Sequence, residues 1–211
     1  EEFSTTYTPY QAEISQGVLQ SIFEYQSMIC ELTGMDVSNA SLYDGASAAA
    51  EAAMMCLDRR RNKVLVSAAS HPDVVETVRT YCWGRNLEIH VVPEKDGHVD
   101  SDALRSLLDD KTACFYFAQP NFYGQLENAA DLIDAVHGAG AKAIMGVNPI
   151  SLGLLKTPGE YSADIAVGEG QPLGMPLSYG GPYLGFLAAK RELTRLLPGR
   201  VVGQTQDAQG R

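Results

Sequence analysis

The chain contains the apolar, β-prone stretch Thr112-Ala113-Cys114-Phe115-Tyr116-Phe117-Ala118-Gln119-Pro120. Runs of the same kind recur about every 20 to 28 residues, at residues 63–69, 87–93, 141–147, 163–168 and 183–189. Such spacing is typical of βαβ units, because one parallel strand can follow another only after a long crossover, which is usually a helix. The sequence therefore predicts an α/β fold with a mainly parallel central sheet.

Helical patterns fill the intervals between these runs, at residues 46–61, 72–84, 101–108, 128–138 and 190–197. Pro72 suits a first helical turn, and Asp100 or Ser101 can cap a helix. Gly84 and Gly138 suit helix ends, because glycine readily adopts the left-handed conformation found there. We expect these helices to cover the sheet.

The first 35 residues have a different pattern, that of one long amphipathic helix over residues 11–34. Its apolar stripe consists of Ile14, Val18, Ile22, Tyr25, Ile29 and Leu32. A stripe at helical spacing predicts a face that packs against the sheet or a partner subunit. We predict one domain over residues 1–211, with an arm and long helix at 1–35, a sheet domain at 36–203 and a truncated tail at 204–211. The lack of an initial methionine and the polar tail predict a fragment of a longer protein.

Composition and charge exclude several classes of function. The 211 residues include 26 acidic and 16 basic side chains, a formal net charge of -10, which is unsuited to binding the phosphate backbone of nucleic acids. No apolar run reaches the roughly 18 residues of a membrane span. We therefore expect neither nucleic acid nor membrane as a partner, and a cytoplasmic location. Four widely spaced cysteines predict buried thiols and no metal site: Cys30, Cys56, Cys82 and Cys114.

Two loops between predicted strands and helices carry candidate binding residues. Gly45 and Ala46 begin a predicted helix, where free backbone amides attract anions and a phosphate could approach closely; a tight turn without a ligand is the alternative. His71 ends one strand and begins the next helix. Its imidazole could stack on an aromatic cofactor, titrate near neutral pH or bond to the local backbone.

Three amide side chains follow other strands of the predicted sheet. Asn121, in Gln119-Pro120-Asn121-Phe122-Tyr123-Gly124, suits a phenolic oxygen or a substrate carboxylate, and it suits a turn cap equally well. Asn148 follows the strand at 141–147, and Gln171 follows the strand at 163–168. These positions share the edge of the sheet at which ligands of such folds bind.

Several segments together resemble subunit 1 of the two-subunit glycine dehydrogenase (decarboxylating), the P-protein of the glycine cleavage system. The resemblance covers essentially the whole chain. It rests on Tyr7-Thr8-Pro9-Tyr10-Gln11-Ala12-Glu13-Ile14-Ser15-Gln16-Gly17, Asn39-Ala40-Ser41-Leu42-Tyr43-Asp44-Gly45, Gln119-Pro120-Asn121-Phe122-Tyr123-Gly124, Gly168-Glu169-Gly170-Gln171-Pro172-Leu173-Gly174, Ser178-Tyr179-Gly180-Gly181-Pro182-Tyr183-Leu184-Gly185 and Leu197-Pro198-Gly199-Arg200-Val201-Val202-Gly203.

The resemblance implies the type I fold of pyridoxal-phosphate (PLP) dependent transferases, here its large domain with helices on both faces of the sheet. In a PLP enzyme of this topology, the strand ends at Asn148 and Gln171 supply an aspartate for the pyridine nitrogen and a lysine for the aldehyde. Gln171 cannot form an imine, and Asn148 cannot supply the negative charge that keeps a pyridinium protonated. The resemblance therefore implies that this chain holds no catalytic residue and no covalent cofactor.

The resemblance also implies partners. Glycine dehydrogenase subunit 2 would carry PLP on its lysine, and the assembled enzyme would decarboxylate glycine and pass the aminomethyl group to the lipoyl arm of the H-protein. There PLP acts as an electron sink once the carboxylate departs, and the isolated fragment would be inactive. We expect Tyr7, Tyr10 and Gln11 to reach the subunit interface near the partner's glycine or lipoyl site; alternatively, these residues pack the amino-terminal arm.

Two other functions stay open from the sequence. A self-sufficient PLP enzyme of the aminotransferase or cysteine-desulfurase type would use Lys156 or Lys190 as its lysine. A structural pseudo-enzyme would only stabilise its partner. A nucleotide-binding Rossmann protein is disfavoured, because no G-x-G-x-x-G motif opens a helix after the first strand.

Overall fold

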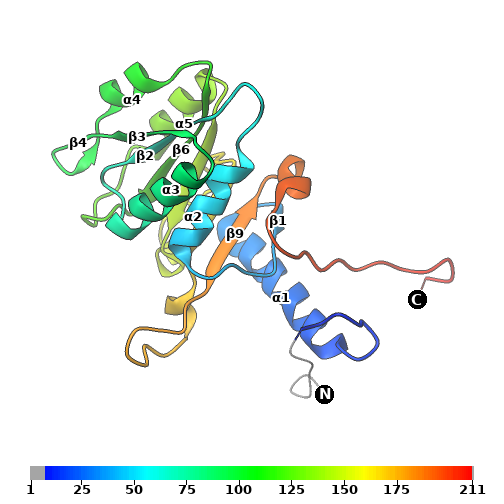
Figure 1. The fold of residues 1–211 in the computed structure, drawn as a ribbon. Helices are drawn as coiled ribbons and strands as arrows, with labels where there is room; N and C mark the ends of the chain where they lie inside the picture. Colours follow the sequence, from blue (N-terminus) through cyan, green and yellow to red (C-terminus); the bar gives the residue numbers. More distant parts are fainter. Residues whose placement is uncertain (1–7, 211) are drawn as a thin grey trace.

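Seven strands form one sheet in the computed structural model, which describes residues 8–210. Their order across the sheet is β1-β9-β8-β7-β6-β2-β3 (Figure 1). The strands are β1 (Val37–Ser38), β2 (Lys63–Ser67), β3 (Glu88–Val92), β6 (Thr112–Gln119), β7 (Lys142–Val147), β8 (Ile165–Glu169) and β9 (Gly185–Ala189). A separate hairpin pairs β4 (Glu94–Lys95) with β5 (His98–Val99).

Five neighbouring strands, β8, β7, β6, β2 and β3, run parallel, whereas β9 runs antiparallel to both β8 and β1. The predicted mainly parallel sheet is confirmed. The direction of β9 follows from its connection, because residues 171–184 return from β8 without a crossover helix and adjacent strands joined in this way pair antiparallel.

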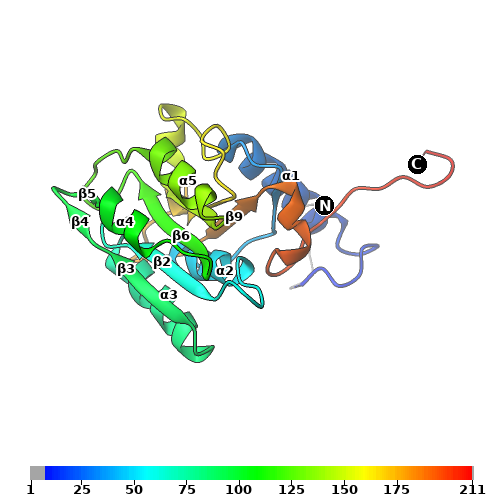
Figure 2. The same cartoon turned by 90° about the horizontal axis from the view of Figure 1, so that it is seen from above.

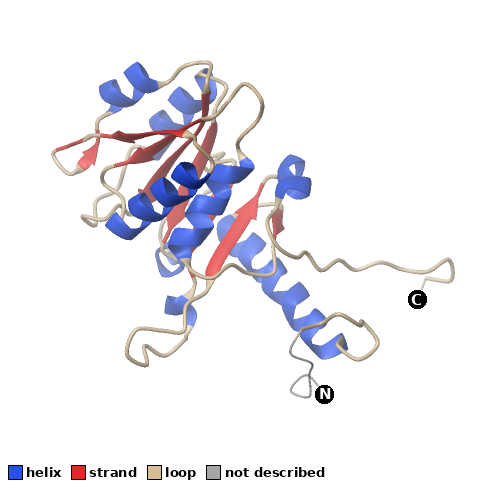
Figure 3. Ribbon diagram, viewed as in Figure 1, coloured by secondary structure: helices blue, strands red, loops and turns tan. Residues whose placement is uncertain are grey.

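Helices cover both faces of the sheet, as Figures 2 and 3 show. They are α1 (Gln16–Thr33), α2 (Gly45–Met55), α3 (Pro72–Gly84), α4 (Ser101–Leu107) and α5 (Ala129–Gly138). Helices α2 and α3 share a core with Cys114 and Tyr116 of β6, while α1, α4 and α5 share another core with Phe115 and Phe117. Because both faces are buried, the central strands read as continuous apolar runs.

Helix α2 is shorter than the sequence predicted. The pattern over residues 46–61 predicted a helix to its end, but α2 ends at Met55. Beyond it, the Asp58 carboxylate accepts hydrogen bonds from the backbone amides of Arg60 and Arg61, both at 2.7 Å. Short acidic side chains compete in this way with helical hydrogen bonding, so the chain turns before β2.

Two other predicted helices also differ at their ends or in kind. The helix predicted over residues 11–34 begins at Gln16, after a turn. The helix predicted over residues 190–197 is the 3-10 segment η3 (Arg191–Leu196). Two further 3-10 segments follow strand ends near the site, η1 (Pro149–Gly153) and η2 (Gln171–Leu173).

Helix α1 packs on the sheet through its carboxyl-terminal half. Ile29 is 2% exposed, whereas Ile14, before the helix starts, is 57% exposed. Gln26 forms two hydrogen bonds with the backbone of Val202, at 2.8 and 2.9 Å, which tie α1 to the carboxyl-terminal segment. Figure 1 shows the amino-terminal half of α1 extending away from the sheet. Among residues 8–210, no helix is both long enough and apolar enough to cross a membrane.

Candidate functional site

A cleft of about 700 Å³ opens at the carboxyl edge of the parallel strands. Its walls come from the ends of β6, β7 and β8 and from the starts of α2 and α3. Tyr183 lines it from the segment of residues 171–184 that connects β8 to β9. Because ligands of open α/β sheets bind outside the carboxyl ends of the strands, this cleft is the candidate site.

Tyr116 of β6 lines the cleft and is 5% exposed. Burial raises the pKa of its hydroxyl above the usual range, so Tyr116 is neutral at physiological pH. The hydroxyl has room because it lies over Gly146 of β7, which also lines the cleft. The pair therefore places a neutral hydrogen-bonding group in an otherwise apolar part of the wall.

His71 lies at the cleft, where its imidazole serves the local structure. Its Nδ1 accepts a hydrogen bond from the backbone amide of Asp73 at 3.2 Å and so caps α3. Its ring meets that of Phe122 edge-on, with centroids 5.1 Å apart. The side chain is 56% exposed. The imidazole is therefore bonded to the local backbone while part of its aromatic ring stays exposed at the cleft.

The carboxylate of Glu169, at the end of β8, accepts hydrogen bonds from three backbone amides. Its Oε2 accepts from Gly45 at 3.0 Å, and its Oε1 accepts from Gln171 at 3.0 Å and from Leu184 at 2.7 Å. Gly45 is the first residue of α2, and Gln171 and Leu184 are the first and last residues of the 171–184 segment. One side chain thus joins the start of α2 to both ends of the 171–184 segment.

Asn148 and Gln171 take different positions. Asn148 lines the cleft, and its Oδ1 accepts a hydrogen bond from the amide of Ile150 at 3.0 Å, which begins η1. Gln171 is not among the residues that line the cleft. Its Nε2 is buried and has no hydrogen-bond partner among the described residues. The residue at the expected lysine position is therefore not part of the cleft lining.

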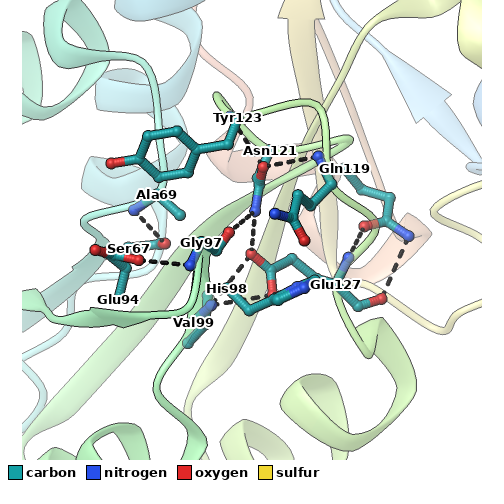
Figure 4. A network of polar contacts seen from close by, with 11 residues as sticks. Ser67, Ala69, Glu94, Gly97, His98, Val99, Gln119, Asn121, Tyr123 and Glu127 are labelled. Atoms are coloured by element: carbon teal, nitrogen blue, oxygen red, sulfur yellow. Dashed lines mark hydrogen bonds and ion pairs between the residues drawn. The ribbon is translucent and has the colours of Figure 1, made fainter.

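Asn121 also lies outside the cleft lining, in a buried polar network that Figure 4 shows. Its Nδ2 donates to the carbonyl of Gly97 and to Oε1 of Glu127, both at 2.7 Å. Its Oδ1 accepts from the amides of Tyr123 and Gln125, both at 3.0 Å. Of the two roles considered for Asn121, a ligand contact and a turn cap, the structure shows the turn cap, because four internal hydrogen bonds occupy the side chain.

Glu127 extends this network to the hairpin. Its carboxylate accepts from the amide of Val99 at 3.1 and 3.2 Å, and its Oε2 lies 3.7 Å from Nδ1 of His98. The amide of Glu127 donates to Oε1 of Gln119 at 2.8 Å. The loop after β6 is therefore held against the β4–β5 hairpin, and it places the Phe122 ring against that of His71.

The amino-terminal candidates lie apart from the cleft. Tyr10 is 81% exposed, and its ring centroid lies 4.9 Å from the guanidinium carbon of Arg200. Gln11 is exposed, and neither residue lines the cleft. Tyr7 lies outside the described residues. Nowhere in residues 8–210 do three or more His, Cys, Asp or Glu side chains gather as a metal site would need.

Residues 1–211 match the family model of the glycine cleavage system P-protein. The chain belongs to that family. Among P-protein relatives, the probable glycine dehydrogenase (decarboxylating) subunit 1 of Carboxydothermus hydrogenoformans is 57% identical over 210 residues, 99% of this chain and 47% of the relative. That of Syntrophomonas wolfei is 58% identical over 208 residues, 98% of this chain and 48% of the relative. The chain thus spans about half the length of the curated P-protein relatives it matches.

Solved structures agree with the P-protein assignment. The crystal structure of glycine decarboxylase (P-protein) of the glycine cleavage system, in inhibitor-bound form, has a TM-score of 0.93 and 45% identity, covering 100% of this chain and 47% of that chain. A sphingosine-1-phosphate lyase from Burkholderia pseudomallei has a TM-score of 0.67 at 14% identity, covering 85% of this chain and 47% of that one. The latter likeness shows the fold alone, which is the type I fold of PLP-dependent transferases.

This P-protein chain has the fold of PLP-dependent enzymes, but the residues that line its cleft do not fit PLP. None of the described residues that line the cleft is a lysine or arginine. Lys190 is paired with Asp164 at 2.8 Å, and Lys156 lies 5.8 Å from the ring centroid of Tyr161; neither lines the cleft. The amide of Gly45 at the start of α2, where a phosphate would bind, already donates to Glu169.

Sequence reasoning missed Glu169 and Tyr116 as site residues. The local signal for Glu169 was an acidic side chain between two glycines at a strand end. Its partner Gly45 lies 124 positions away in the sequence, so the contact itself has no local signature. Tyr116 sits inside the apolar run of β6, where nothing in the pattern separates a cleft residue from a core residue.

Proposed function

We propose that this chain forms part of subunit 1 of a glycine dehydrogenase (decarboxylating), whose active enzyme needs a second subunit that carries the cofactor lysine. One observation carries the proposal: the described lining of the cleft contains no lysine, in a chain whose relatives are named subunit 1. A subunit with a PLP-transferase fold and no lysine at its cleft must obtain the cofactor's chemistry from a partner.

The proposed reaction is that of the assembled enzyme. Glycine would lose its carboxylate, and the aminomethyl group would pass to the lipoyl arm of the H-protein, with PLP bound by subunit 2 as the electron sink. This chain would supply no catalytic residue and would complete the active site of subunit 2 from across the interface. We keep the cytoplasmic location as part of the same proposal, on the ground of the cysteine pattern in the sequence.

The 171–184 segment supports the need for a partner. It carries exposed apolar side chains beside the cleft, among them Leu177 at 73% exposure and Tyr183 at 56%. Tyr179 is fully exposed, and Figure 1 shows the segment projecting from the body of the protein. Clustered exposed apolar groups mark interaction surfaces, so we place part of the interface with subunit 2 on this segment.

We extend the proposed interface to the amino-terminal arm. Tyr10 and Gln11 are exposed ahead of α1 and leave their polar atoms accessible. In the complete complex, replacing Tyr7 and Tyr10 by phenylalanine should lower turnover, because the hydroxyls would be lost near the partner's glycine or lipoyl site. Unchanged kinetics in this double variant would leave these rings with a packing role only.

The decisive experiment measures exchange of labelled bicarbonate with the carboxyl group of glycine. The full chain is assayed alone, and then with the candidate second subunit and PLP. We expect activity in the mixture alone. Activity of this chain by itself would mean that one of its own lysines holds the cofactor, and it would overturn the proposal.

A second experiment separates the proposed role from that of a structural pseudo-enzyme. His71→Ala and Asn148→Ala change residues that line the cleft, whereas Asn128→Ala changes an exposed residue outside it as a matched control. If the chain only stabilises its partner, all three variants should retain full exchange activity wherever the complex still forms. A specific loss in the cleft variants would favour a direct role at the active site.

A further inference from the structure

Three backbone amides converge on one point at the edge of the cleft. Those of Gly45, Gln171 and Leu184 all donate to the Glu169 carboxylate, over distances of 2.7 to 3.0 Å. Converging amides at a helix start or in a turn form a binding site for anions, because they present partial positive charge without a counter-ion. The anion at this point is part of the chain itself.

The close packing at Gly45 allows the start of α2 to reach the Glu169 carboxylate. A Cβ atom on Gly45 would lie 3.0 Å from the backbone nitrogen of Glu169 and 3.2 Å from its Cβ. Glycine thus allows the start of α2 to approach the end of β8 closely enough for the hydrogen bond. The close approach brings the carboxylate to the place that an external anion would take.

The remaining lining of the cleft offers an anion no compensation. Asp44 and Asp73 line it together with Glu169, and no described lining residue is a lysine or arginine. Asp44 also caps α2, because its Oδ1 accepts from the amide of Ser47 at 2.6 Å. A phosphate entering the cleft would meet three carboxylates and a helix start at which the amides of Gly45 and Ser47 already donate to Glu169 and Asp44.

We propose that Glu169 is a resident anion that occupies the phosphate position at the start of α2 and excludes phosphate-bearing ligands from this cleft. Glu169 then determines specificity: it is the residue that prevents this chain from binding PLP through its phosphate, separately from the missing lysine. The same side chain ties the 171–184 segment to α2. This inference concerns the chain's own cleft and does not depend on the reaction that the complex performs.

The test replaces the resident anion by an external one. Glu169→Ala removes the carboxylate and leaves the three amides free. Thermal unfolding and phosphorus NMR titration of the full chain are followed with increasing inorganic phosphate, at ionic strength held constant with chloride. We expect a saturable rise in melting temperature and a saturable NMR shift for Glu169→Ala, because a ligand that binds only the folded state stabilises it, and neither effect for the unchanged chain.

Glu160→Ala is the matched control. Glu160 also accepts a backbone amide, that of Thr157 at 2.7 Å, but it lies outside the cleft lining, so its loss should create no response to phosphate. Saturable phosphate binding to the unchanged chain would overturn the proposal, as would a folded Glu169→Ala variant that does not bind phosphate. If that variant is unfolded in chloride, phosphate must restore its fold; failure to restore it also overturns the proposal.

Discussion

The hydroxyl oxygen of Tyr116 lies 2.2 Å from the position that a Cβ atom on Gly146 would occupy. In the sheet, Tyr116 of β6 pairs with Ile144 of β7, and Gly146 pairs with Ala118. The tyrosine side chain therefore extends along the sheet to lie over the glycine, and it reaches the cleft through the space that the missing side chain leaves. A ring of this size next to any other residue would have to move away from the cleft wall.

Gly146→Ala should therefore destabilise the fold and reshape the cleft. The added methyl group overlaps the Tyr116 hydroxyl within a packed core, where overpacking costs about 1–3 kcal/mol. Urea unfolding measures the loss. Gly138→Ala is the control, because a Cβ there would meet nothing within 4 Å; it should leave stability equal or slightly higher. Equal stabilities of Gly146→Ala and the unchanged chain would contradict the packing described here.

Asn121→Ala should destabilise the loop after β6. The substitution leaves the carbonyl of Gly97 and the amides of Tyr123 and Gln125 without their partner, and unpaired groups at such sites cost about 1–3 kcal/mol. We expect a lower urea midpoint and faster proteolysis within residues 121–127.

The matched control for this loop is Asn128→Ala. Asn128 is exposed, and its side chain bonds only to Asp131 on the same helix start, so the change in unfolding free energy should stay within about 0.5 kcal/mol. Equal sensitivity of the two asparagine variants would mean that the buried network does not hold the loop.

Asp164 should make stability depend on pH in the acid range. Burial alone would raise the pKa of this carboxyl, but hydrogen bonds from Lys190, the amide of Ala143 and His137, each at 2.8 Å, lower its pKa below the usual value. A carboxyl whose pKa is lower in the folded state contributes stability above its unfolded pKa of about 3.9. That contribution is lost as the pH falls through the folded pKa.

Asp164→Asn tests this dependence. At pH 7 the variant should unfold about 2 kcal/mol more easily, since hydrogen bonds to a charged group are lost. The difference from the unchanged chain should shrink as the pH falls below about 4. Asp134→Asn, at an exposed position of α5, should show no such trend. A difference that is constant with pH would show that the carboxylate charge is not the cause.

Leu177→Asp combined with Tyr179→Asp should weaken binding to subunit 2. Both side chains are exposed on the 171–184 segment, and a charge placed in an apolar interface must be desolvated without a partner. We expect the dissociation constant to rise at least about tenfold, or ~1.4 kcal/mol, in a titration of the two subunits.

Trp83→Asp is the control for that titration. Trp83 is 83% exposed at the end of α3, on a different element from the proposed interface, so its loss should not change binding. Identical affinities of the double variant and the unchanged chain would remove the 171–184 segment from the interface.

Local patterns located the strands well because each central strand is buried on both faces and must be apolar throughout. The runs at 63–69, 112–120 and 141–147 all became strands with nearly the predicted ends. Helix ends were harder to predict. The pattern over 46–61 continued past Met55, where the turn at Asp58 ended the helix through side-chain bonds that periodicity does not report.

The candidate site was predictable only in part. His71 and Asn148 were expected at the ligand edge, and both line the cleft. Asn121 occupies the same sequence context, a polar residue after a strand, yet its side chain turns into the network with Glu127. The difference depends on where the β4–β5 hairpin lies, and a strand-end pattern contains no information about that neighbour.

The sequence by itself determined the α/β class, the family and the glutamine at the lysine position, because burial periodicity and short motifs are properties of adjacent residues. Only the tertiary structure decided that Glu169 meets Gly45, that Gln171 does not line the cleft and that Tyr116 does. These relationships depend on the approach of elements far apart in the chain. Their physical basis is hydrogen bonding and steric fit between β8, α2 and β6, which form only when the sheet is assembled.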